Sequence, residues 1–246
     1  MNYGMYEETE SLYLSAIEWL NNKGYYDADL YNSLGRYYYQ AIGNKQKSLY
    51  YLNKAKEIFE EKGILSNGYF RTLISMGAIY HGDNNLLAKL YYDVGRSVMQ
   101  NNYEIDNSFG DVIILYHNLA LLYYNLGINE EAIKVLSEVI EMCNDHFGVE
   151  LEKLRLLSDL EYIKGDTKSE MEYLKEIVNI NKGIDHRLHD YMRLIYLEHL
   201  LSDKDLLQDA VFYFNEFLDD IVHSFSYLTE ENREIFVEKK DTTLKH

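Results

Sequence analysis

Proline is absent from this sequence of 246 residues. Because proline breaks the interior of an α-helix, its absence favours a chain built almost entirely of helices. Cysteine occurs once, as Cys143, which excludes an internal disulfide and fits a reducing compartment. The apolar runs, such as "VIILY" and "LALLYY", are too short to span a bilayer, and the opening "MNYGMYEETE" has no signal-peptide pattern. These absences predict a soluble, cytoplasmic chain.

Positive charge is also scarce. The chain has 41 acidic residues against 24 basic ones, for a formal net charge of −17. Such a field repels nucleic acid and anionic membranes, which are bound by clusters of Lys and Arg. Tyrosine is abundant instead, with 25 copies. It suits helix interfaces with solvent-exposed edges, because its ring can be buried while its hydroxyl finds a hydrogen-bond partner. The expected partner is therefore a protein or peptide, with no nucleic acid and no membrane.

The clearest repeated unit is "YHNLALLYYNLGINEEAIKVLSEV", from Tyr116 to Val139. It resembles the tetratricopeptide repeat (TPR), in which small residues let two antiparallel helices touch while large residues fill the seam. The matching positions are Tyr116, Leu119, Ala120 and Tyr123, then Gly127 at the turn, then Ala132, Leu136 and Val139.

Four further units carry the same pattern with slips of one residue or with substitutions. The small sites of the five units are Gly35, Gly77, Ala120, Ser158 and Glu198, which lie 42, 43, 38 and 40 residues apart. The standard TPR period is ~34 residues, so the helices or linkers here are longer. In the fifth unit Glu198 replaces the small residue, and the expected seam residues include Leu194, Leu197, Leu201 and Phe214.

The resemblance implies an all-α fold, a right-handed TPR-like superhelical solenoid of antiparallel helix pairs in a single domain, residues 1–246. The expected pairs are 28–63, 69–102, 112–145, 150–182 and 186–223. A leading helix at 7–24 is expected to bury a stripe of Leu12, Ala16, Trp19 and Leu20. That helix reads either as a natural cap or as the second helix of a repeat whose first helix is missing. A C-terminal capping helix is expected at 229–240.

Catalytic patterns are missing from the sequence. No phosphate loop, dinucleotide fingerprint, paired-Cys zinc pattern or nucleophile elbow occurs. His186 and His189 have a spacing that would place two imidazoles on one helical face, but no cysteine or second pair accompanies them. Cys143 and the His81-Gly82 pair lie at helix ends and turns, and the motif around a caspase-type cysteine is absent. We therefore expect no enzyme, no metal site and no cofactor.

The candidate binding residues follow from the resemblance, because the first helix of each TPR lines the concave face of the array. Residues one turn from the seam are expected in that groove: Asn32, Arg36, Tyr39, Arg71, Ser75, His81, His117, Leu121, Tyr124, Arg155, Asp159, Tyr162, Tyr196 and His199. Arg and Tyr are frequent in binding hot spots. Three Arg and three His against one acid predict a groove for a peptide with an acidic or C-terminal carboxylate feature. The alternative is that these residues form ordinary solvated helix faces.

The stretch "SFSYLTEENREIF" departs from the repeats. Its residues Phe225, Ser226, Tyr227, Leu228, Thr229, Glu230, Arg233 and Phe236 are similar to the junction in TPR–CHAT proteins, in which a TPR array precedes a caspase-like protease domain. The resemblance implies a regulatory or sensing segment, with a downstream protease domain as a possible partner. The same stretch also reads as a plain capping helix. A free-standing TPR scaffold, adaptor or oligomerisation module and a peptide-sensing regulator remain the alternative functions.

Overall fold

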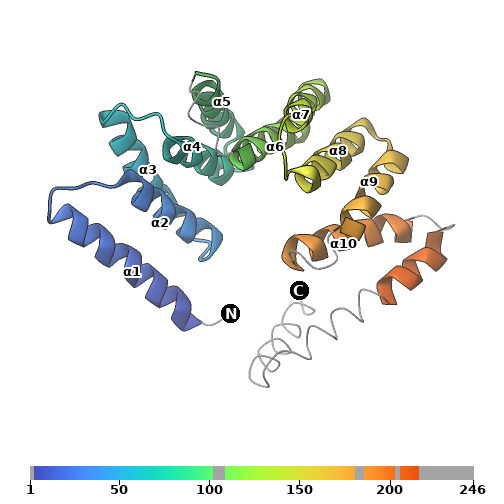
Figure 1. Ribbon diagram of the computed structural model, residues 1–246, viewed down its shortest axis with the longest axis horizontal. Coiled ribbons are helices and arrows are strands. Elements are labelled where there is room, and N and C mark those ends of the chain that lie inside the picture. The colour runs from blue at the N-terminus through green and yellow to red at the C-terminus, as the bar shows by residue number, and fades with distance from the viewer. Residues whose placement is uncertain (1–2, 102–108, 181–185, 203–205, 216–246) are drawn as a thin grey trace. The chain divides into compact units, whose positions relative to one another are not determined.

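The structure is a computed structural model, and it describes residues 3–101, 109–180, 186–202 and 206–215. All regular secondary structure in these ranges is helical (Figure 1). The chain divides into two compact units, Met1–Gly165 and Asp166–His246, here called unit 1 and unit 2. Their boundary falls within the fourth predicted helix pair. A single domain of residues 1–246 stays a prediction.

Unit 1 contains eight helices in its described residues. They are α1 (Tyr3–Asn21), α2 (Ala28–Gln40), α3 (Lys45–Glu61), α4 (Asn67–Tyr80), α5 (Asn85–Asn101), α6 (Phe109–Asn125), α7 (Asn129–Cys143) and α8 (Glu150–Lys164). The pairs α2/α3, α4/α5 and α6/α7 pack together, and α8 packs on α7. In addition α2 contacts α4, α4 contacts α6, and α6 contacts α8. Unit 1 therefore has helix pairs at 28–61, 67–101 and 109–143, where the sequence predicts pairs at 28–63, 69–102 and 112–145, and the four first helices lie in order along one face.

Small residues face large ones across the seams of unit 1, as the pattern predicts. A Cβ added at Gly35 would lie 2.7 Å from Leu52 Cγ, and one added at Gly77 would lie 2.3 Å from a ring carbon of Tyr92. Leu52 and Tyr92 have no exposed surface. These distances leave no room for a side chain, so glycine is what permits the close approach of the helices.

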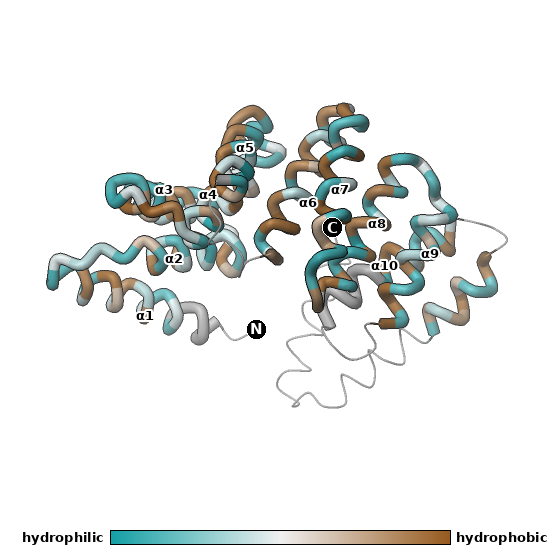
Figure 2. The backbone as a smooth tube through the Cα atoms, turned by 45° about the horizontal axis from the view of Figure 1, so that its top comes forward, coloured by the Kyte–Doolittle hydropathy of each residue, from teal (hydrophilic) through white to brown (hydrophobic). Residues whose placement is uncertain are grey.

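The core of unit 1 contains one large apolar cluster that runs from Ala28 to Ile163, with smaller clusters around Leu34 and Met76. Along α4 to α7 the chain alternates between hydrophobic and hydrophilic segments, as expected of helices buried on one face (Figure 2). Side chains cap the starts of α2, α3 and α4. Asp27, Asn44 and Ser66 each accept a hydrogen bond from the backbone N–H of the residue three positions later.

The leading helix α1 is present, but the predicted stripe on it is wrong. Leu12 and Trp19 are 71% and 58% exposed, whereas Ile17 is 8% exposed and packs with Leu34 and Tyr38. The Tyr38 hydroxyl also donates a hydrogen bond of 2.5 Å to the Glu10 carboxylate. Both faces of α1 carry apolar residues, so periodicity alone could not choose between them, and this contact with α2 decides the rotation of the helix.

Unit 2 contains α9 (Thr167–Ile180), α10 (His186–Ser202) and a further helical stretch at residues 206–215. Helix α9 packs against α10. The buried apolar residues of this unit include Leu174, Ile177, Leu197, Leu200 and Ala210.

The predicted seam of α10 is only partly right. Leu197 is buried as the pattern predicts, but Leu194 and Leu201 are 52% and 56% exposed, and Glu198 is exposed as well. The buried face also carries Arg193 and Tyr196. An aromatic contact explains the rotation of the helix, because the ring of Tyr196 meets that of Tyr213 edge-on at 5.0 Å. Phe214, beside Tyr213, is 44% exposed and lies off the predicted seam too.

The rest of the predicted fifth pair, 216–223, lies outside the described residues, as do the capping helix at 229–240 and the TPR–CHAT-like stretch.

Candidate functional site

The face built by α2, α4, α6 and α8 in unit 1 carries most of the predicted groove residues. Partly exposed side chains on it are Arg36, Tyr39, Arg71, Ser75, His81, His117, Leu121, Tyr124, Arg155 and Asp159, and Tyr162 is 52% exposed. Asn32 differs, since it is only 4% exposed. Helix α2 packs against α1, α3 and α4, which leaves little of its circumference open. Asn32 therefore offers almost no surface to a ligand.

Many of these side chains bond to the next first helix along the face. Arg71 Nε on α4 lies 2.5 Å from Asp111 Oδ2 on α6. His117 Nε2 on α6 lies 2.9 Å from Asp159 Oδ2 on α8. The sequence analysis assigned Arg71, His117 and Asp159 to ligand binding, yet each already has a partner one repeat away.

Aromatic and amide groups make similar links between repeats. The Tyr39 hydroxyl donates to the Ala78 carbonyl oxygen at 3.3 Å. The Tyr124 hydroxyl donates to that of Tyr162 at 3.3 Å, with the two rings edge-on. These links lie on the face built by α2, α4, α6 and α8, and they connect each first helix to the next.

His81 ends α4, and its Nε2 lies 3.1 Å from Asn125 Nδ2. Burial lowers the pKa of His81, and repulsion from His117 lowers it further. Its imidazole is therefore held in the neutral form, which can accept or donate one hydrogen bond but contributes no positive charge at neutral pH. This removes one of the expected cations from the face.

Two of the predicted cations, Arg36 and Arg155, have no ion-pair partner among the described residues. The Nε atom of Arg155 is shielded from solvent and has no hydrogen-bond partner. Because that atom is shielded from solvent, a ligand would have to accept from the terminal nitrogens of the Arg155 guanidinium.

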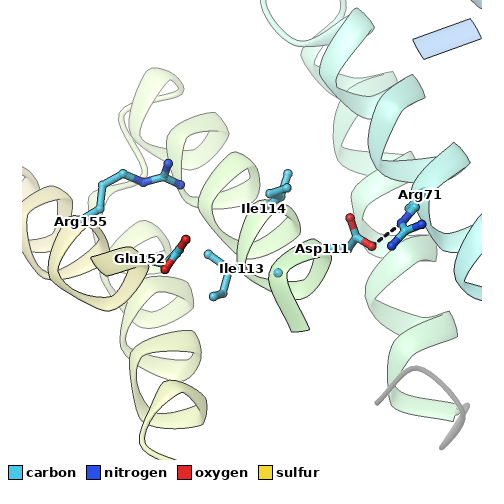
Figure 3. A pocket seen from close by; sticks show the side chains of 7 residues that line it. Arg71, Asp111, Ile113, Ile114, Glu152 and Arg155 are labelled. Atoms are coloured by element: carbon cyan, nitrogen blue, oxygen red, sulfur yellow. Dashed lines mark hydrogen bonds and ion pairs between the residues drawn. The ribbon is translucent and has the colours of Figure 1, made fainter. Parts of the chain in front are cut away.

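Arg155 and Arg71 line one cavity of about 390 Å³ between α4, α6 and α8. The remaining described residues that line it are Gly110, Asp111, Ile113, Ile114 and Glu152. In Figure 3, Arg71 and Asp111 meet on one side of the isoleucines, and Arg155 and Glu152 extend from α8 on the other. The volume is within the range of about 300–1,000 Å³ that is typical of ligand sites.

Sequence reasoning found the two arginines of this cavity but not Asp111 or Glu152. A signal existed for Asp111, which follows Arg71 by 40 residues, close to one repeat. Both acids change the character of the site, because the positive charges are matched by negative ones.

In unit 2 the predicted residues Tyr196 and His199 are engaged in internal contacts. Tyr196 is 9% exposed and packs on Tyr213, so its expected position on an open face is wrong, for the reason given with the register of α10. His199 Nε2 lies 3.0 Å from Glu170 Oε1, and Glu170 is 5% exposed.

Cys143, which was considered for catalysis, lies apart from this face. Cys143 is 3% exposed and belongs to the apolar cluster of unit 1. Burial raises the pKa of its thiol, which disfavours the nucleophilic thiolate. Within the described part of the chain, no group of three or more His, Cys, Asp or Glu side chains is arranged to hold a metal ion. The side chains of His186 and His189 lie outside it.

Solved structures with TPR-like repeats are similar to this chain. BtubC (BKLC) from P. vanneervenii aligns with a TM-score of 0.60 at 19% identity, over 74% of this chain and 77% of that one. A putative kinesin light chain with nearly identical TPR-like repeats from Podosopora anserina aligns with a TM-score of 0.55 at 15% identity, over 76% and 94%. A single-substitution variant of that protein gives 0.56 at 15% identity, over 77% and 95%.

These likenesses show the fold: the chain is all-α and has the architecture of a TPR-like helical solenoid. No protein-family model matches the chain, and no curated protein matches its sequence. Among the helices that the structure describes, none combines the length and the apolar character needed to cross a membrane.

Proposed function

We propose that this chain is a non-catalytic recognition module that binds a segment of a partner protein on the face of α2, α4, α6 and α8. The observation that carries the proposal is the continuity of that face: consecutive first helices touch, and a cavity with two arginines opens between three of them. Ligand sites are typically concave, with a few polar groups among apolar ones. The net charge of −17 favours a protein or peptide over nucleic acid as the partner.

Charge reversal on this face tests the proposal. We would compare capture of partners from source-cell extract by the wild-type chain and by the double variant Arg36→Glu/Arg155→Glu. These two arginines make no ion pair within the described chain, so their reversal should leave the helices intact. We expect partners captured by the wild type to be lost, because both side chains would then repel the groups they bind.

The matched control is Lys54→Glu/Lys134→Glu, which changes the net charge equally on the second helices α3 and α7. Both lysines are exposed, and their ion pairs with Glu57 and Glu131 lie at the surface, where such pairs contribute little to stability. Capture should survive in this variant. If the two double variants bind partners equally, the first-helix face is not the binding surface.

The finer form of the proposal is that the module is the regulatory or sensing segment of a caspase-like, CHAT-type protein. It is supported by the TPR-like fold together with the residues near the C-terminus that are similar to a TPR–CHAT junction. The test is the mass of the native protein in source cells, detected with an antibody against these repeats. A species well above 29.1 kDa with Cys-dependent proteolytic activity would support it, whereas a species of 29.1 kDa would leave a free-standing adaptor.

A further inference from the structure

The α8 wall of the cavity presents two opposite charges without partners. Arg155 and Glu152 both line the cavity and lie three residues apart on α8, a spacing that places them on one face of a helix. Neither makes an ion pair or a hydrogen bond with another described residue. Figure 3 shows both side chains extending toward α6.

The opposite wall is already neutral. Arg71 is paired with Asp111 at 2.5 Å, so its charge is largely satisfied within the protein. Between the two walls lie Ile113, which is 1% exposed, and Ile114, which is 44% exposed, so Ile114 supplies the apolar surface. The cavity thus has an apolar floor, one uncommitted cation and one uncommitted anion, and its four charged side chains sum to zero.

From this arrangement we propose that the cavity binds a bipolar partner segment, in which an acidic and a basic side chain flank an aliphatic one. The acidic group accepts hydrogen bonds from Arg155, the basic group donates to Glu152, and the aliphatic side chain packs on Ile114. This inference rests on the proposed function and adds the chemistry of the partner to it.

Like charges exclude the simpler ligands. A segment with acids on both sides would satisfy Arg155 but would set its second carboxylate against Glu152, with Asp111 nearby. It would also be repelled at long range by the net charge of −17. A segment with two bases would meet Arg155 in the same way. Such repulsion between unmatched charges is how binding sites reject wrong partners.

A set of short peptides tests this pattern directly. Each has the sequence Gly-x-Ile-z-Gly, where x and z are Glu, Lys or Gln, and both termini are blocked so that only the side chains carry charge. Binding to the full chain would be followed through the methyl resonances of Ile113 and Ile114, assigned with the variants Ile113→Val and Ile114→Val. We expect one of the two mixed peptides, Glu/Lys or Lys/Glu, to bind at least about tenfold more tightly than Glu/Glu or Lys/Lys.

Exchanging the two charges of the wall gives the decisive variant. The double substitution Glu152→Arg/Arg155→Glu keeps the net charge and the lining volume, and it should transfer the preference to the other mixed peptide. Unshifted methyl resonances in the free variant, apart from those beside the substitutions, would show that the fold is intact.

Two outcomes would overturn the inference. One is tightest binding of the doubly acidic peptide, which would make the cavity a carboxylate site and leave the proposed function standing. The other is no response of either methyl group to any peptide. If partner capture still depends on Arg36 and Arg155 in that case, only the bipolar ligand is rejected; if capture is also insensitive to them, the proposed function fails too.

Discussion

Units 1 and 2 use the same kind of helix but bury different chemistry. In unit 1 the buried polar side chains of the described residues are neutral, namely Asn32, Ser48, Thr72 and Ser158, within a large apolar cluster. In unit 2 they are charged: Glu170 is 5% exposed and Arg193 is 3% exposed.

The partners of these charges are polar or aromatic. Glu170 lies 3.0 Å from His199, and the guanidinium of Arg193 sits over the ring of Tyr213 at 5.7 Å. Unit 1 therefore selects its helix packing by the fit of small against large residues. Unit 2 adds to its apolar core two buried charged groups, which tolerate burial only when they have partners. A rule based on small and large residues does not contain such polar contacts, and it misplaced Leu194 and Leu201 on α10.

The sharpest way to break this comparison is to truncate one leucine from the expected seam of each unit. Leu119 has no exposed surface, so Leu119→Ala should lower the free energy of unfolding by about 2–5 kcal/mol. Leu194 is 52% exposed, so Leu194→Ala should change it by less than about 0.5 kcal/mol. Urea denaturation of both variants measures the two values. Equal losses would mean that α10 has the register expected from the sequence.

A double-mutant cycle on Glu170 and His199 tests the polar packing of unit 2. Glu170→Ala should cost about 1–3 kcal/mol, because it removes a hydrogen bond from a buried site. The double variant with His199→Ala should lose about 1–2 kcal/mol less than the sum of the single losses, since the two side chains act on each other. Strictly additive losses would show that this contact contributes nothing to the stability of unit 2.

Substitutions of two glycines test the role of close packing, and they should change the free energy of unfolding by smaller amounts and in opposite directions. At Gly77 a Cβ would lie 2.3 Å from the Tyr92 ring, so Gly77→Ala should destabilise by about 1–2 kcal/mol through overpacking. At Gly95, in the middle of α5, the nearest atom would be 3.7 Å away. Gly95→Ala should therefore stabilise by up to about 1 kcal/mol, because alanine favours the helix. Thermal unfolding should give a lower melting temperature for Gly77→Ala and a higher one for Gly95→Ala than for the wild type. A Gly77→Ala variant as stable as the wild type would contradict the close packing of this seam.

The seams of unit 1 could be predicted because their information is local. The pattern of small and large residues at helical spacing marks the face of each helix that meets its neighbour, and Gly35 and Gly77 do face Leu52 and Tyr92. Prediction failed where a helix is apolar on more than one side. On α1 the choice between Ile17 and Leu12 depends on where α2 lies, which periodicity does not contain.

Part of the lining of the cavity was predicted from the sequence, but its charge balance was not. Arg71 and Arg155 were expected on the first-helix face, and both line its cavity. We expected free positive charge on this face because Arg71 and His117 were counted as available to a ligand. Each of them has a carboxylate partner on the next first helix. The expectation of a carboxylate-bearing peptide gives way to the bipolar ligand proposed above.

By itself, the sequence determined the helices, their pairing in unit 1 and the face on which we propose that a partner binds. These follow from periodicity, from the absence of proline and from glycines spaced about one repeat apart, all of which act within a few turns of the chain. Only the tertiary structure decided which charges are free. Arg71 and Asp111 are 40 residues apart in the sequence, and they meet because α4 and α6 pack side by side. Charge neutralisation depends on distance in space, and the stacking of the repeats sets that distance.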